Sequence, residues 1–221
     1  MNRMTVLAMA GAALVAGGIA GCATAPQNNM TFFVTSTGGG KGADLGGLAG
    51  ADAHCQKLAA AAGAGNRVWR AYLSQQAIGG AQAINARDRI GSGPWTNAKG
   101  VIVAYNIEEL HGNNNLTKQT ALTEKGAVVN GRSEKPNTHD IMTGSDWYGR
   151  TFPPGTDMTC GNYTKSGAEG QVQVGHSDRE GLSDDPVARA WHASHTSRGG
   201  CSQDALRSTG GAGLFYCFAA R

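Results

Sequence analysis

Short apolar runs alternate with stretches rich in Gly, Asn, Ser and Thr along most of this chain. An apolar face followed by Gly63 and Gly65 predicts a helix over 49–62, and 76–89 is expected to be a second short helix or an irregular stretch. Aromatic, β-branched and alternating residues predict short strands at 30–36, 68–74, 101–104, 127–129, 141–152 (a strand and a turn), 162–163, 171–175 and 214–218. The pattern therefore predicts an α+β, loop-rich domain with short strands and one or two helices.

The amino-terminal residues have the pattern of an export signal. Arg3 precedes an apolar run from Thr5 to Ala20, which is short for a membrane-spanning helix of about 20 apolar residues. The run ends in Ile19-Ala20-Gly21-Cys22, which resembles the lipobox of bacterial lipoproteins, where lipid joins the cysteine thiol and cleavage follows. We therefore expect cleavage before Cys22 and a lipid anchor on its thiol. The alternative is an uncleaved anchor helix that carries a cysteine by chance.

Cleavage at this position divides the chain into a signal peptide (1–21), a lipidated tether (22–30) and one domain (31–221). The residue after Cys22 is Ala23, whereas Asp at this position resembles an inner-membrane retention signal. We therefore expect a lipid-anchored protein of the cell envelope, in the outer membrane, with its domain in the periplasm or at the cell surface.

Charge and composition narrow the function classes. Residues 1–21 hold one Arg and no acid, so 18 of the 19 basic side chains stand against 16 acidic ones in the remainder. The charges are interspersed, so no basic run predicts binding to nucleic acid. The 34 glycines predict many turns and a large loss of chain entropy on folding, which cross-links would offset.

Four cysteines remain after Cys22, at positions 55, 160, 201 and 217. An even number in an exported protein predicts disulfides, and three pairings are possible. The alternative is a zinc site, although no two of these cysteines have the close spacing usual there.

A helix with a cysteine, a Trp-containing strand and a last strand with another cysteine resemble the C-type lectin-like fold, in particular its endostatin-like branch. The resemblance covers roughly residues 31–221, and several bacterial lipoproteins of little-known function look similar. It implies short antiparallel strands and nested disulfides, Cys55–Cys217 and Cys160–Cys201. The matching segments are 50–55 (GADAHC), 69–74 (WRAYLS), 86–89 (ARDR), 144–146 (GSD), 160–163 (CGNY), 174–178 (VGHSD) and 210–218 (GGAGLFYCF).

The chain departs from the family's metal motifs. Sugar-binding members hold calcium with Glu-Pro-Asn or Gln-Pro-Asp and Trp-Asn-Asp triplets, but Lys135 interrupts the first triplet here and the last is missing. The zinc site of endostatin uses a His-rich tail, and Ala23–Met30 contains no His. We therefore carry over neither site.

Late histidines form the best candidate metal site. His176, Asp178, His192 and His195 offer imidazole and carboxylate ligands for a divalent transition metal. His192 and His195 share a face only if their segment is helical. In the alternative interpretation, these side chains bond to loop backbone and fix turns.

Aromatic residues form a second candidate. Trp147, Tyr148 and Trp191, with Asp146 beside them, are a possible stacking platform for a sugar ring. The alternative is core packing.

The chain lacks a Gly-x-Ser-x-Gly elbow and a His-Glu-x-x-His helix, so we expect no enzyme. The first hypothesis is a binding or adhesion module for a glycan or protein. The second is a metal-dependent protein or hydrolase centred on the His/Asp site. The third is a purely structural envelope lipoprotein.

Overall fold

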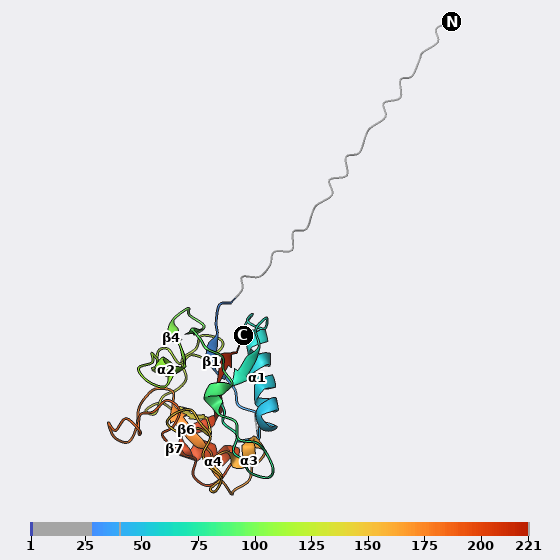
Figure 1. Cartoon of the computed structure of the whole chain (residues 1–221). Coiled ribbons are helices and arrows are strands. Elements are labelled where there is room, and N and C mark those ends of the chain that lie inside the picture. The colour runs from blue at the N-terminus through green and yellow to red at the C-terminus, as the bar shows by residue number, and fades with distance from the viewer. Residues whose placement is uncertain (2–27, 40, 221) are drawn as a thin grey trace.

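The structure is a computed structural model that describes residue 1 and residues 28–39 and 41–220 (Figure 1). The expected signal peptide, the lipidation site Cys22 and most of the tether lie outside the described residues. The described domain is α+β, as the hydrophobic pattern predicts.

A central strand, β8, organises the main sheet. It pairs antiparallel with β1 and β2 and parallel with β5, which continues through β6 to β7. The strands of this sheet are β1 (Phe32–Val34), β2 (Trp69–Ala71), β5 (Asp140–Met142), β6 (Gln173–His176), β7 (His195–Thr196) and β8 (Gly211–Ala219). A separate two-stranded sheet contains β3 (Trp95–Thr96) and β4 (Ile102–Ala104).

The parallel pairing of β5 with β8 corrects the expectation of antiparallel strands throughout. Parallel neighbours need a long crossover connection. The segment between these two strands holds β6, β7 and two short helices, and it provides that length.

The main helix, α1 (Gly47–Ala61), lies along one side of the sheet (Figure 1). Its buried residues Ala51, Cys55 and Ala59 are four apart, so they share the face that packs on the sheet. Three shorter helices and a 3₁₀ turn complete the described elements: α2 (Ile107–Leu110), α3 (Cys160–Tyr163), α4 (Gln203–Thr209) and η1 (Ala86–Asp88).

Several local expectations were wrong. The sequence predicted one or two helices and missed α4, which is short and mostly polar and begins where Ser202 caps the amide of Ala205. Residues 162–163 lie in the helical turn α3 and not in a strand. Residues 127–129 form only an isolated bridge, because the sheet offers them no continuous neighbour.

Alternate residues of β8 fill the two halves of the core. Phe215 and Cys217 lie in one buried cluster, on the side of α1, whereas Leu214, Tyr216 and Phe218 lie in the other. Side chains alternate across a strand, so β8 is buried on both faces. This explains why its sequence is a nearly continuous apolar run.

Two disulfides join the elements as the resemblance implied. Cys55–Cys217 ties α1 to β8, and Cys160–Cys201 ties α3 to the loop before α4. Their Cα–Cα distances are 5.7 and 5.8 Å, which are ordinary for disulfides.

Removing the Cys55–Cys217 disulfide with the double substitution to alanine should destabilise the domain strongly. The two cysteines are separated by 162 positions in the sequence. In the chain-entropy model, a disulfide that closes a loop of this length raises the free energy of the unfolded chain by about 5 kcal/mol. Denaturant unfolding of the purified protein measures the loss of stability. An unchanged unfolding midpoint would contradict the stabilising role of this disulfide. The matching double alanine variant at Cys160 and Cys201 gives the comparison for a disulfide that closes a shorter loop.

Candidate metal centre

The pairing of β5, β6 and β7 brings three polar side chains to one face of the sheet. Asp140 lies directly opposite His176 in the antiparallel β5–β6 pair. His195 lies opposite Val174, which is two residues before His176 and therefore on the same face. These strands lie at the end of the domain away from β1 and the carboxyl terminus (Figure 1).

A glycine permits this close arrangement. A Cβ at Gly175 would lie 2.1 Å from the carbonyl oxygen of Trp191 and 2.2 Å from the amide nitrogen of His192. Only a residue without a side chain therefore lets the segment before β7 pass this close to β6. That approach carries His195 to His176.

The donor atoms of these three residues lie at distances suited to one metal ion. Asp140 Oδ1 is 3.3 Å from His176 Nε2 and 3.6 Å from His195 Nε2, and the two Nε2 atoms are 2.9 Å apart. Ligands bonded to zinc at about 2.0–2.1 Å in a tetrahedron are separated by about 3.3 Å. The rings of His176 and His195 are tilted by 59°, as adjacent ligands can be.

His139 adjoins this group in a different way. Its Nε2 lies 3.1 Å from Asp140 Oδ1, and its ring stacks on that of His176 with an interplanar angle of 6° and centroids 4.2 Å apart. A ligating imidazole directs its lone pair in the ring plane, so two parallel stacked rings do not point at one ion. Although His139, Asp140 and His176 offer atoms within 4.8 Å of one another, the geometry favours Asp140, His176 and His195 as ligands.

Asp178 fixes the orientation of His139. Its Oδ1 accepts hydrogen bonds from His139 Nδ1 at 2.9 Å and from the backbone amide of Glu180, and its Oδ2 accepts one from the backbone amide of Arg132. A carboxylate behind a histidine in this way sets which ring nitrogen carries the proton.

The carboxylate of Asp140 is the unusual feature of the group. Its side chain is 2% exposed, and neither oxygen receives a hydrogen bond from a described residue, because the nearby imidazoles do not meet hydrogen-bond geometry. A buried carboxylate is costly without a nearby positive charge. Either a metal ion or a protonated histidine therefore has to balance it.

The pKa values give the direction of this balance. Burial lowers the pKa of His139, but Asp140 and Asp178 raise it more, to about 9. Burial raises the pKa of Asp140, and His139 and His176 lower it to a net value below its usual range. Without a metal, His139 is therefore an imidazolium between two carboxylates.

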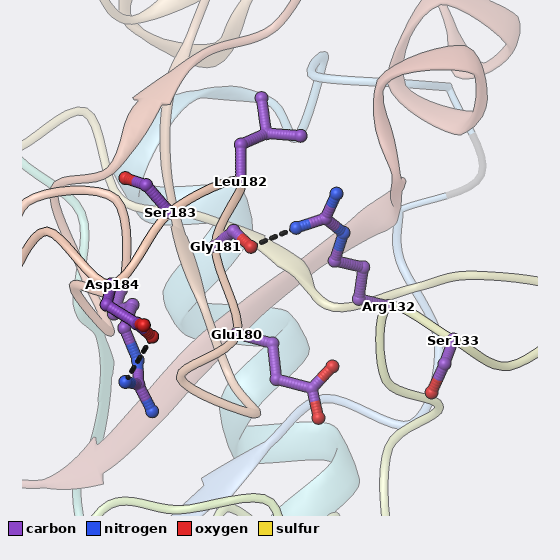
Figure 2. Close-up of a pocket in the computed structure, with 8 residues that line it drawn as sticks. Arg132, Ser133, Glu180, Gly181, Leu182, Ser183 and Asp184 are labelled. Carbon is purple, nitrogen blue, oxygen red and sulfur yellow. Dashed lines mark hydrogen bonds and ion pairs between the residues drawn. The ribbon is translucent and has the colours of Figure 1, made fainter.

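A cavity of about 480 Å³ opens over the group, with His139, His176 and His195 among its lining residues. The side chain of His195 is 38% exposed, so this histidine faces the cavity. An adjoining hollow of about 520 Å³ shares Arg132, Glu180, Gly181 and Leu182 with it. Figure 2 shows Arg132 extending to the carbonyl of Gly181 in this second hollow.

The structure places only part of the predicted metal set together. His176 and His195 are adjacent, and Asp178 reaches them through His139. His192 is separate: it is buried, its Nε2 donates to the carbonyl of Trp147 at 2.9 Å, and its ring packs on Trp191. The expectation that His192 joins the set is corrected, because the segment before β7 is bent and directs His192 to the carbonyl of Trp147.

The predicted aromatic set is also divided. Trp191 is buried in the core, where its Nε1 donates to Leu110, whereas Trp147 and Tyr148 are exposed. Asp146 Oδ1 accepts the amides of Tyr148 and Arg150 and so fixes their turn. These side chains do not form one stacking platform.

Sequence reasoning missed His139 and Asp140. They follow a polar loop and directly precede the apolar residues of β5, a place where a buried charged pair is unusual. That contrast is the signal that could have found them.

The buried His192 predicts acid sensitivity. Burial lowers its pKa to about 3, whereas the unfolded chain takes up the proton at 6.5. The unfolded state therefore binds more protons between these values, and stability falls as pH falls, by about 1.4 kcal/mol per pH unit for one proton. Denaturant unfolding measured from about pH 6.5 to about pH 4 gives the free energy of unfolding at each pH. This free energy should fall less steeply with falling pH in His192→Gln than in the wild type. Equal slopes would refute this, and His54→Gln, on α1, is the control.

Comparisons with known proteins leave the site to be interpreted from its own geometry. A scan against protein-family models and a search of curated proteins both find no match. Among the described residues, every helix is too short or too polar to cross a membrane. The arrangement of Asp140 and its histidines is therefore what supports a function.

Proposed function

We propose that this chain is an exported binding protein whose ligand site is a divalent transition-metal centre formed by Asp140, His176 and His195. The observation that carries the proposal is the convergence of one carboxylate oxygen and two imidazole nitrogens, separated by 2.9–3.6 Å, beside a cavity that the two histidines line. Three protein ligands leave a coordination position for an external molecule.

The donor set favours a transition metal over calcium. Calcium takes six to eight oxygen ligands, whereas two imidazoles and one carboxylate suit zinc and its neighbours. His139, held by Asp178, supports this site from behind, as outer-shell residues do in metal sites. Binding of the cation also balances the buried charge of Asp140.

The domain itself is proposed to be C-type lectin-like and of the endostatin-like branch. The disulfide from α1 to the last strand, the pairing of β1 with β8 and the second disulfide support this. The proposed metal centre lies on other residues than the calcium triplets of sugar-binding members, so the function does not follow from the fold.

Removing one ligand should weaken metal binding. Because changes outside the ligand shell already cost about 10–100-fold in affinity, His195→Ala and Asp140→Asn should each lower zinc affinity at least about 100-fold. Titration calorimetry of the purified lipoprotein in detergent, after chelation and dialysis, measures the affinity. Asp178→Asn, which changes a residue outside the ligand shell, should lower zinc affinity by only about 10–100-fold.

His54→Gln is the matched control, since this histidine lies on α1 and bonds to Thr37. The proposal fails if the wild-type protein takes up no zinc, cobalt, nickel or copper. It also fails if His195→Ala binds these ions as tightly as His54→Gln does.

We further propose that Cys22 carries the lipid that holds the domain to a membrane, on the support of the sequence motif at 19–22. In cells, Cys22→Ser should remain unprocessed and lose its acyl chains, because the thiol is the acceptor. Mass spectrometry of the native protein should find an acylated amino terminus at Cys22. An intact leader without acyl chains would overturn this part of the proposal.

A further inference from the structure

We infer that the open position of the metal centre takes an oxyanion, a carboxylate or phosphate group, and that Arg198 on the cavity wall binds the same group. The inference rests on the proposed metal function and adds the chemical class of the ligand. It follows from the side on which the centre opens and from the charges around that side.

The centre opens in one direction only. Asp140, His139 and His176 have side chains at most 5% exposed, whereas His195 is 38% exposed. An ion held by these atoms is therefore covered on the side of β5 and faces the cavity beside β7. A ligand reaches it from there.

The charge on that side is positive. Arg132 and Arg198 line the cavity, and within the described part of the chain neither side chain lies within 4.0 Å of a carboxylate. Glu180 is the one acidic residue among those lining the cavity. The cavity wall thus carries two guanidinium groups and one carboxylate, so this side attracts an anion.

Arg198 is the better placed of the two arginines. It follows β7 by two residues, so it is attached to the same strand as the ligand His195. Its backbone amide donates to Thr209 Oγ1, and the residue is exposed and lines the cavity. Guanidinium groups bind carboxylates and phosphates through paired, charge-assisted hydrogen bonds.

The cavity has room for more than the anion. The hollow that shares Arg132 extends it past Leu182, an apolar side chain that is largely exposed (Figure 2). A ligand with an acidic group at the metal and a larger body along this hollow would fit both parts. An acidic sugar or a phosphorylated molecule has this form.

Cobalt-loaded lipoprotein offers a direct test, because the visible spectrum of Co²⁺ changes when an anion enters its coordination shell. Acetate and inorganic phosphate should each change the spectrum saturably, and galactose should not. Loss of a charge-assisted hydrogen bond should weaken anion binding about tenfold in Arg198→Gln, with unchanged cobalt affinity. Arg207→Gln is the control, since Arg207 is exposed and pairs with Asp204 on α4. Comparing acetate with phosphate tells which anion is preferred.

Two results would overturn the inference while leaving the metal function intact. One is cobalt uptake with no spectral response to either anion. The other is an equal response in Arg198→Gln and in the wild type, or an equal response to galactose. Failure to take up cobalt would instead overturn the metal function itself, so the two failures are distinguishable.

Discussion

The buried carboxylate of Asp140 is the constraint around which this end of the molecule is arranged. It lies where β5 pairs with both β6 and β8, and its backbone hydrogen-bonds to Gly210. A Cβ at Gly211, the first residue of β8, would lie 3.0 Å from the carbonyl oxygen of Asp140, so a side chain here would press on the backbone of Asp140. The fold therefore places a charge where water does not reach it and where only a cation can balance it.

A proton on His139 and the proposed metal ion are two cations that could each provide that balance, and Asp140 is the residue they share. In the metal-free protein, the imidazolium of His139 lies between Asp140 and Asp178. A metal ion bound to Asp140 would replace much of this positive charge, so that His139 would release a proton and keep its hydrogen bond to Asp178. In the proposed centre, metal and proton would thus be linked through one carboxylate.

Local pattern predicted much of the fold and less of the site. The helix α1, the buried strand β8 and both disulfides could be predicted, because periodicity, apolar runs and a family resemblance each point to them. The left-handed turn of α3 could not, since non-glycine residues such as Asn162 adopt positive φ there only because tertiary contacts with Gln76 hold them. The proposed ligand set needed the register of three strands, which brings Asp140 and His195 to His176 and leaves His192 outside the set.

The most direct measurement is anomalous diffraction from crystals grown with zinc, recorded on both sides of the zinc absorption edge. The account predicts one strong anomalous peak about 2.0–2.2 Å from Asp140 Oδ1 and from the Nε2 atoms of His176 and His195, on the side that faces the cavity. No peak in this position, with His139 still bridging the two carboxylates, would contradict it.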